Sequence, residues 1–419
     1  MKKILYISYD GLTDPLGQSQ ILPYLKQLTK LGNNFTILSF EKRKRYVKES
    51  EIIRTITKEA GILWVPLFFT VKPPLLSKIY DRLRMWRVAF SLHKKHTFDI
   101  VHCRSYVAAE MGLKLKQKFG IKMLFDMRGF WADEKVDNGQ WNMAKFFYKK
   151  IYKFYKNRER AFLLGADGVV TLTEAAKNYL LHQPIYKNII VDVIPCCADL
   201  DHFDYRKISP IDINELKNKL NIPREAKVIT YSGSVGGWYM TKEMFHFFNT
   251  VLQQYPEYIM LILTKDDPDK VKEEAVTNGI LPGKVIVTYV ERSKMPLYLS
   301  VSDFSVFFIR NTFSKIASSP TKHAELMGMG IPVICNDIGD TGYIISETNT
   351  GCVINSFEKE QFENIVGRLT ELEGLDKQRI RDSAFHFFDL HAGVKKYAAF
   401  YNKLLHYNSE PDQLLHEST

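Results

Sequence analysis

Short runs of β-branched and aromatic residues alternate with longer amphipathic segments along the first half of the chain. Each run leads into a turn rich in Gly or Asp and then into apolar residues at a 3.6-residue period, as in 19–31, which stops at Gly32 as a helix C-terminus should. Such alternation predicts a parallel sheet covered by helices. The expected strands lie at 4–9, 35–40, 63–67, 100–102, 123–126, 169–172 and 189–194.

The same rhythm starts again near Val228, with expected strands at 228–232, 258–263, 285–289, 304–309 and 332–335. The stretch 198–222 between the two series is polar, contains Pro210, precedes Pro223 and has no strong apolar period. The pattern predicts an α/β protein with two doubly wound, Rossmann-like domains, 1–203 and 204–388, and a polar tail at 408–419. A cleft between two such sheets is where a nucleotide and a second substrate would meet.

Composition excludes several classes of protein. The 45% hydrophobic share is too high for a mainly disordered chain, and 419 residues suit about two domains. No stretch approaches the 18 or more apolar residues of a membrane-spanning helix. The five cysteines are odd in number and lack C-x-x-C spacing, which argues against a disulfide framework or a zinc site. D-P-D at 267–269 matches a metal-type D-x-D only as a string, and a helix N-terminus explains it better. We therefore expect a cytoplasmic protein without a metal.

The net charge of +11 is unevenly divided between the predicted domains. Residues 1–203 carry a net charge of +15 and residues 204–419 a net charge of −4. Within the basic half, the segments 82–96 and 145–156 interleave cations with aromatic residues at helical spacing. Such helices can lie on an anionic membrane surface, or can simply pack their aromatic rings into the domain. Nucleic acid is a weaker candidate because no recognition motif accompanies the charge.

The strongest local motif is S-S-P-T-K-H-A-E at 318–325, followed by L-M-G-M-G-I-P-V-I-C. Ser319 can cap a helix and Pro320 suits its first position, so the free amides of the first turn would form an anion site. Lys322 and Glu325 would share one helix face, the lysine neutralising a diphosphate and the carboxylate accepting ribose hydroxyls. A capped helix with a surface ion pair is the plainer alternative.

Two glycine-rich loops could complete a phosphate site. Y-S-G-S-V-G-G-W-Y at 231–239 follows the first strand of the second domain and contains Gly233 and Ser234, although it is not the G-x-G-x-x-G fingerprint. D-G-L-T-D-P-L-G-Q-S-Q at 10–20 follows the first strand of the chain, and Gly11 and Gly17 bracket its turn. Either loop could equally be a tight turn with no ligand.

Charged residues gather at the carboxyl ends of two expected strands in the first domain, where such sheets place their ligands. These ends are D-I-V-H-C-R-S at 99–105 and F-D-M-R-G-F-W-A-D-E at 125–134. His102 by itself is more typical of a core histidine. The candidate residues are His102, Arg104, Asp126, Arg128, Asp133 and Glu134.

D-P-L-G-Q-S-Q-I-L-P-Y-L near the start and S-P-T-K-H-A-E-L-M-G-M-G-I-P-V-I near the end resemble the family 4 retaining glycosyltransferases of the GT-B fold. The likeness extends over essentially the whole chain. F-D-M-R-G-F-W-A-D-E looks like a branch that builds bacterial surface polysaccharides.

The resemblance implies transfer of a sugar from a nucleotide diphosphate to an acceptor with retention of configuration and without a metal or other cofactor. The leaving diphosphate would take the acceptor's proton on the same face. Glu325 would bind the donor ribose, while Lys322 and the amides of Thr321 and Lys322 would hold the diphosphate. The first domain would bind the acceptor, and a terminal helix at 389–407 would cross back onto that domain. The implied donor-side residues are Gly11, Gly17, Gly233, Ser234, Lys242, Arg310, Lys315, Thr321, Lys322 and Glu325. Asp126 and Arg128 are the catalytic candidates, and His102, Arg104, Asp133 and Glu134 lie on the acceptor side.

The chain departs from the family pattern at three positions. Ala317 stands where the first of two glutamates is usual, Ser234 replaces an arginine, and Arg128 stands where a histidine is often found. Cations for the diphosphate could come instead from Arg310 and Lys315. We expect a glycan or lipid-linked acceptor at an anionic membrane surface. A catalytically impaired partner subunit and a nucleotide-sugar epimerase remain the alternatives.

Overall fold

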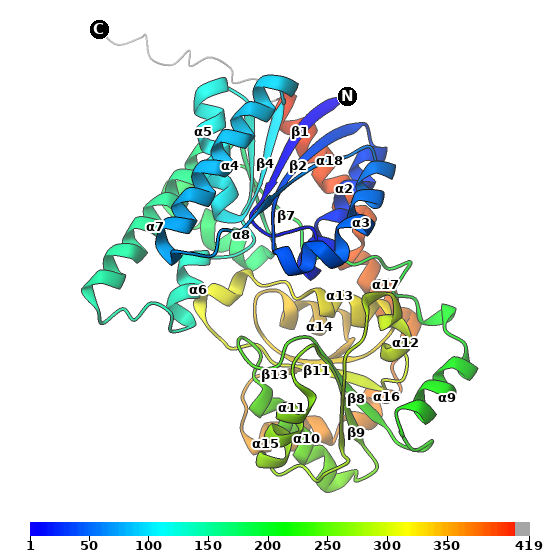
Figure 1. The fold of residues 1–419 in the computed structure, drawn as a ribbon. Coiled ribbons are helices and arrows are strands. Elements are labelled where there is room, and N and C mark those ends of the chain that lie inside the picture. The colour runs from blue at the N-terminus through cyan, green and yellow to red at the C-terminus, as the bar shows by residue number, and fades with distance from the viewer. Residues whose placement is uncertain (407–419) are drawn as a thin grey trace.

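The computed structural model describes residues 1–406, and its first part is built around a seven-stranded parallel sheet (Figure 1). The expected tail at 408–419 lies outside the described residues, as does residue 407. Neighbouring strands follow the order β3-β2-β1-β4-β5-β6-β7. The strands are added in one direction from β1 to β3 and in the other direction from β4 to β7, so the topological switch point lies between β1 and β4. Their bounds are β1 Lys2–Ser8, β2 Asn33–Glu41, β3 Leu63–Phe68, β4 Ile100–Arg104, β5 Lys122–Asp126, β6 Gly168–Thr171 and β7 Val191–Val193.

Both faces of this sheet are buried. Alternate residues of β1 point to opposite faces, so Ile4 and Tyr6 join one hydrophobic cluster while Leu5 and Ile7 join the other. A strand buried on both sides reads as a continuous apolar run, which is why the period-based expectation succeeded here.

The second part is a six-stranded parallel sheet in the order β10-β9-β8-β11-β12-β13. Its bounds are β8 Val228–Ser232, β9 Ile259–Leu263, β10 Val285–Thr288, β11 Phe304–Phe307, β12 Val333–Asn336 and β13 Gly351–Ile354. The sequence patterns missed β13, because its four residues follow a polar segment and only two of them are buried. Two doubly wound sheets confirm the predicted α/β architecture.

Helices connect successive strands and cover the sheets. In the first domain they are α1 Pro15–Gln20, α2 Leu22–Lys30, α3 Arg43–Glu59, α4 Pro74–His96, α5 Ser105–Phe119, α6 Trp131–Asp137, α7 Phe146–Gly165 and α8 Glu174–Leu181. The remaining helices are α9 Pro210–Lys219, α10 Thr241–Gln254, α11 Pro268–Thr277, α12 Met295–Leu299, α13 Thr321–Gly328, α14 Thr341–Thr348, α15 Lys359–Val366, α16 Leu369–Glu373, α17 Lys377–Phe388 and α18 Leu390–His406.

The chain crosses between the domains twice, and the two crossings pair with each other. The Ala198 amide donates to the Phe388 carbonyl at 3.0 Å, and the Leu390 amide donates to the Ala198 carbonyl at 3.2 Å. After the second crossing α18 packs against α2, and Tyr397, Tyr401 and their neighbours enter the core of the first domain (Figure 1). The C-terminal helix is therefore part of the first domain in space.

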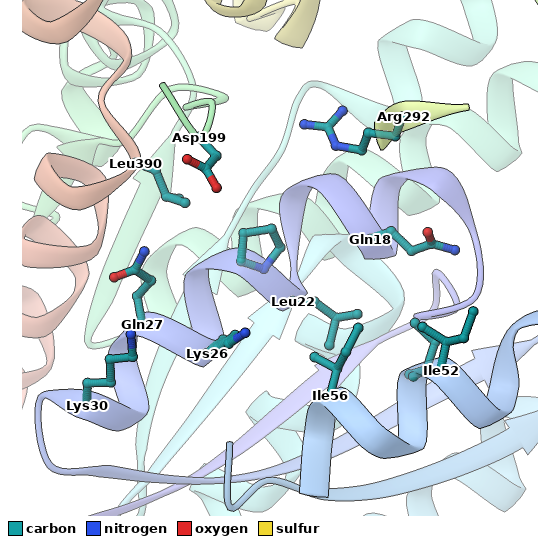
Figure 2. Close-up of a pocket in the computed structure, with 12 residues that line it drawn as sticks. Gln18, Leu22, Lys26, Gln27, Lys30, Ile52, Ile56, Asp199, Arg292 and Leu390 are labelled. Atoms are coloured by element: carbon teal, nitrogen blue, oxygen red, sulfur yellow. The ribbon is translucent and has the colours of Figure 1, made fainter. Parts of the chain in front are cut away.

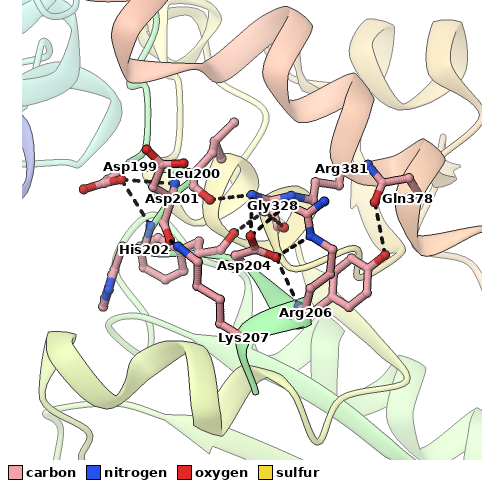
Figure 3. A network of polar contacts seen from close by, with 12 residues as sticks. Asp199, Leu200, Asp201, His202, Asp204, Arg206, Lys207, Gly328, Gln378 and Arg381 are labelled. Atoms are coloured by element: carbon pink, nitrogen blue, oxygen red, sulfur yellow. Dashed lines mark hydrogen bonds and ion pairs between the residues drawn. The ribbon is translucent and has the colours of Figure 1, made fainter. Parts of the chain in front are cut away.

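A buried arginine ties the first crossing to the second domain (Figure 3). Arg381 on α17 has 1% of its surface exposed and donates to the carbonyls of Leu200, Phe203 and Gly328. It also forms an ion pair with Asp204 at 3.2 Å. One guanidinium thus satisfies three buried carbonyls and a carboxylate at the interdomain linker.

Candidate functional site

A cleft of about 490 Å³ lies between the carboxyl edges of the two sheets. The first domain contributes residues from the loop after β1, the start of α5 and the segment after β5. The second domain contributes the loop after β8 and the segment that leads into α13. The lining includes Asp10, Arg104, Arg128, Trp131, Glu134, Trp238, Tyr239, Lys315, Ser318 and Thr321.

Helix α13 presents its N-terminus to this cleft, because Thr321 lines it. The expectation for Ser319 is wrong: Pro320 occupies the N-cap position, and the Ser319 hydroxyl accepts the Cys196 amide at 3.1 Å instead of capping the helix. That bond joins the helix entrance to the interdomain linker. The amides of Thr321 and Lys322 remain in the first turn without an intrahelical acceptor, as an anion site requires.

Lys322 points into the glycine turn after β8. Its Nζ lies 3.6 Å and 4.0 Å from the ring centroids of Tyr239 and Tyr231, and it has no hydrogen-bond partner among residues 1–406. A Cβ at Gly233 would lie 2.7 Å from Nζ, so only glycine leaves room for the ammonium group. Burial lowers the pKa of Lys322 well below its usual value, and Glu325 offsets this only in part.

Glu325 is paired with Arg292 rather than with Lys322. Arg292 Nη1 lies 2.7 Å from Glu325 Oε1, and the arginine also stacks over the Phe203 ring at 5.3 Å. Arg292 lines a second cavity of about 390 Å³, where it and Gln18 stand at one end and Gln27 and Lys30 at the other (Figure 2). Helix α13 therefore reaches from the cleft, at Thr321, toward this second cavity, at Glu325.

The loop after β1 is shaped by close packing against a buried carboxylate. Glu41, fully buried at the end of β2, accepts the amides of Leu12 and Thr13 at 2.8 and 3.1 Å. A Cβ at Gly17 would lie 2.2 Å from the Gly11 carbonyl oxygen, so this turn depends on glycine. Gly11 and Gly17 thus shape the loop through contacts inside the first domain.

Asp126 lies behind the cleft and holds the arginines that line it. Its carboxylate is 3.6 Å from Arg128, 3.7 Å from Arg104 and 3.5 Å from His102 Nε2, with 1% of the side chain exposed. Burial by itself would raise the pKa of Asp126, but Arg128, His102 and Arg104 outweigh it and lower this pKa to about 2. So weak a base is suited to positioning cations rather than to transferring protons.

His102 is a core histidine that connects the C-terminal helix to this group. Its Nδ1 lies 2.7 Å from the Tyr401 hydroxyl, and 2% of its surface is exposed. Burial lowers its pKa, and Asp126 offsets this only in part. His102 therefore does not reach the cleft. Arg128 does, and its backbone adopts a φ of 61°, a strained conformation for a non-glycine residue that directs the chain away from β5.

Glu134 and Lys315, predicted for opposite sides of the site, contact each other across the domain interface. Lys315 Nζ lies 2.7 Å from Glu134 Oε1 and 3.9 Å from the Trp238 ring centroid. Asp133, the neighbour of Glu134, points the other way and bonds Tyr152 and Lys156 on α7. Because successive residues of a helix point in different directions, α6 separates the Asp133 and Glu134 carboxylates, which the sequence analysis had placed in one group.

The remaining predicted residues stand at the margin or outside the cleft. Lys242 is exposed at the start of α10, and Arg310 is exposed 6.0 Å from the Trp238 ring. The Ser234 carbonyl accepts the Tyr231 hydroxyl. Neither Lys242 nor Arg310 belongs to the described cleft lining. Asp267 caps α11, as expected for a helix N-terminus.

The structural roles of several residues could not be predicted from the sequence. Arg292 follows β10 in a polar segment with no motif, and Glu41 resembles any acid next to a basic run. Ala317, at the place of the missing glutamate, is buried in the hydrophobic cluster of the first domain. Contacts between distant segments decide all three, so local spacing could not reveal them.

Within residues 1–406, no group of three or more His, Cys, Asp or Glu side chains is arranged to hold a metal ion. No described helix is both long enough and apolar enough to cross a membrane.

Similar folds occur among solved structures. A glycosyltransferase from Rickettsia africae matches with a TM-score of 0.68 and 19% identity over 97% of this chain and 99% of that one. Anabaena HepE, solved with UDP and glucose, matches with a TM-score of 0.68 and 13% identity over 96% and 100% of the two chains. WaaG, a glycosyltransferase involved in lipopolysaccharide biosynthesis, matches with a TM-score of 0.65 and 13% identity over 95% and 99%. No curated protein matches the sequence.

Two family models match consecutive parts of the chain. Residues 20–202 match Glycosyltransferase Family 4, and residues 212–384 match Glycosyl transferases group 1. Each match falls on one of the two doubly wound sheets described above. The chain therefore belongs to the family 4 glycosyltransferases of the GT-B fold.

Proposed function

We propose that this glycosyltransferase moves a hexose, with retention of configuration, from a nucleotide diphosphate sugar to a glycan or lipid-linked acceptor in cell-envelope polysaccharide synthesis. The observation that carries the proposal is the interdomain cleft, which Thr321 at the N-terminus of α13 and Lys315 line together with Arg104 and Arg128 of the first domain. Cations and free amides on both sides suit a diphosphate donor and an anionic acceptor.

The donor half of the proposal rests on α13. The diphosphate would bind the amides of Thr321 and Lys322 and draw the Lys322 ammonium out of its aromatic surroundings. Glu325 lies one turn further along the helix. Its carboxylate can accept the ribose hydroxyls once Arg292 no longer bonds Oε1. HepE, which shares the fold, was solved with UDP and glucose, and this supports a nucleotide-sugar donor. We propose that these groups hold the diphosphate without a metal.

The proposed reaction needs no protein base of high pKa. The bond from the anomeric carbon to the diphosphate oxygen breaks, the acceptor oxygen attacks from the same face, and its proton passes to the departing diphosphate. Arg104 and Arg128, held by Asp126, would steady the charges that develop at the first-domain side of the cleft. We therefore propose a positioning role for Asp126, and roles next to the substrates for Arg104 and Arg128.

The acceptor side is proposed to meet an anionic membrane, which would make the protein peripheral on the cytoplasmic face of the plasma membrane. We define the α4–α7 patch as the exposed apolar residues Leu76, Ile79, Tyr80 and Leu83 on α4 and Phe146, Phe147 and Phe154 on α7. Arg82 donates to Tyr155, so the two helices are neighbours. Exposed lysines at 145, 149, 150 and 153 flank the phenylalanines. Rings and cations combined in this way favour an anionic bilayer.

A product assay tests the proposal. The purified chain is incubated with a panel of nucleotide sugars, with and without a membrane extract that supplies acceptors, and products are identified by mass spectrometry. We expect nucleoside diphosphate release that depends on the acceptor, and an α product from an α-linked donor by NMR. A changed sugar with donor alone would indicate an epimerase, and donor binding without turnover would indicate an impaired partner subunit. Either result would contradict the proposal.

A further inference from the structure

A separate cavity of about 410 Å³ lies behind the entrance to α13. Its walls come from the start of α8, the interdomain linker, the N-terminus of α14 and the junction of α17 with α18. Ser318, Ser319 and Pro320 line both this cavity and the cleft, so one segment of chain separates the two spaces. Whatever fills the cavity would press against the segment that positions the amides of α13.

His323 supplies an unused polar group to this cavity. The side chain is fully buried between the rings of Phe307 and Phe388, and neither ring nitrogen has a hydrogen-bond partner within residues 1–406. Burial lowers the pKa of His323 to about 3, so the imidazole is neutral. A neutral imidazole offers one donor and one acceptor, and leaving both unmade in a protein interior is unfavourable.

Asp340, Lys396 and Glu174, three charged residues that line the cavity, already have partners. The Asp340 carboxylate accepts the amides of Glu174 and Ala175 at 2.7 and 3.0 Å. Lys396 donates to the Val193 carbonyl at 3.1 Å, and Glu174 pairs with Lys177 at 3.4 Å. The other walls are largely apolar, including Tyr343, Ile344 and Phe387. A largely apolar pocket at a domain interface, open to solvent at Tyr343 and holding a buried polar group without a partner, has the features of a small-molecule site.

We propose that this cavity binds a small uncharged aromatic molecule bearing a hydroxyl group, which hydrogen-bonds His323 and strengthens donor binding by holding Ser318–Pro320 against α13. The site itself does not depend on the proposed function, whereas its coupling to the donor does. Because the shared segment is ordered by either ligand, each should raise the affinity of the other by the same factor.

Direct binding is tested with 4-fluorophenol by fluorine NMR on the full chain. For a probe of this size we expect a dissociation constant of about a millimolar. His323→Phe keeps the ring packing and removes the hydrogen bond, so 4-fluorophenol should bind about fivefold more weakly to it. Fluorobenzene, which lacks the hydroxyl, should bind both proteins equally, and 4-fluorobenzoate should bind neither. No saturable binding, or equal binding of 4-fluorophenol to both proteins, would overturn the site.

A second variant fills the space instead of changing its polarity. Ile344→Trp should abolish probe binding, while Ile211→Trp on the exposed surface of α9 should not. Retained binding in Ile344→Trp would place the probe elsewhere and overturn the assignment. The donor is then titrated as UDP with and without saturating 4-fluorophenol. We expect at least a twofold gain in UDP affinity in the wild type and none in His323→Phe, and an unchanged affinity in the wild type would overturn the coupling. If UDP does not bind at all, the proposed donor fails while the probe titration still reports on the cavity.

Discussion

At the scale of single residues, the two groups expected to bind the donor are each held by a protein partner. Glu325 is paired with Arg292, and Lys322 rests on two tyrosine rings in place of a counter-ion. Both are more than nine-tenths buried, so neither exists as a freely hydrated charge. A ligand that hydrogen-bonds both groups would offset part of the free-energy cost of burying them.

The first prediction concerns Glu325→Ala. Loss of two charge-assisted hydrogen bonds to ribose should weaken binding of the nucleotide-sugar donor about 100-fold, measured by isothermal titration calorimetry. The fold should be intact by circular dichroism, since Arg292, which loses its partner, is 39% exposed and can be hydrated. Glu347→Ala on the exposed face of α14 is the matched control and should bind normally. Unchanged affinity in Glu325→Ala would remove the ribose assignment.

The second prediction is that Lys322→Met stabilises the protein while removing donor binding. The pKa of Lys322 is lower in the folded than in the unfolded state, so keeping the lysine charged opposes folding at neutral pH. The resulting loss of unfolding free energy is greatest below the pKa of Lys322 in the folded state, and it disappears as the pH rises toward 10.5.

The melting temperature of Lys322→Met should therefore exceed that of the wild type most at low pH, and the gap should narrow as the pH is raised. Differential scanning calorimetry from pH 6 to pH 9 measures this. Lys219→Met, at an exposed position of α9, should show no gain. A destabilised Lys322→Met at every pH would show that contacts of the ammonium with the rings outweigh its burial.

At the scale of elements, the first domain presents two helices, α4 and α7, that leave part of their apolar residues outside the core. Segment 82–96, which the sequence singled out, turns Met85 and Ala89 inward, so the exposed apolar part of α4 lies earlier in the helix. Segment 145–156 begins α7 and keeps Phe146, Phe147 and Phe154 outside. The membrane hypothesis therefore applies to the α4–α7 patch and not to the whole of segments 82–96 and 145–156.

The third prediction tests this patch. Phe146→Ser combined with Phe147→Ser should lower binding to phosphatidylglycerol-containing vesicles about tenfold, because two rings no longer enter the interface. Vesicle co-sedimentation measures the effect. Donor affinity should stay unchanged, since neither residue lines the cleft. Ile211→Ser, an equally exposed apolar residue on α9, should leave vesicle binding as it is.

The fourth prediction concerns the linker and α17. Arg381→Met leaves Asp204 and three buried carbonyls without this donor, which should cost about 3 kcal/mol of unfolding free energy. Urea denaturation followed by fluorescence measures it. Arg379→Met on the exposed side of the same helix loses a single bond to the Thr348 carbonyl and should cost less than about 1 kcal/mol. Equal losses for both variants would mean that Arg381 does not hold the linker.

At the scale of the whole molecule, charge is divided between the two sides of the cleft. Residues 1–203 carry +15, most of it outside the cleft, whereas residues 204–419 carry −4 and need only local cations at α13. Exposed charges act over about 10 Å at 0.1 M salt and about 3 Å at 1 M. The excess therefore bears on association with an extended anionic surface more than on donor binding.

The fifth prediction follows from that division. Binding to anionic vesicles should fall by at least about tenfold between 50 mM and 500 mM salt, while binding to uncharged phosphatidylcholine vesicles should be weak at both. The protein alone is compared at each salt concentration to exclude aggregation. A lack of salt dependence, or equal affinity for uncharged vesicles, would contradict an electrostatic contribution from the first domain.

The sequence by itself determined the two sheets and the motif that enters α13. Buried parallel strands are continuous apolar runs and their helices are amphipathic, so the signal for each element is complete within about ten residues. The short strand β13 escaped, since its neighbours in sequence are polar, and so did helix α9, which lies in the polar stretch 198–222. The family resemblance likewise rested on contiguous residues, and the two family-model matches confirm it.

Only the tertiary structure decided how the charged residues are paired. Arg292 is 33 positions from Glu325, Lys315 is 181 from Glu134, and Tyr401 is 299 from His102. Such pairs form because the sheet topology brings distant loops to one edge, where burial makes each unpaired charge unfavourable. Spacing along the chain records which residues share a helix face or a strand end. It carries no record of which partner satisfies a buried charge, and that partner decides whether a residue touches the substrate or holds the one that does.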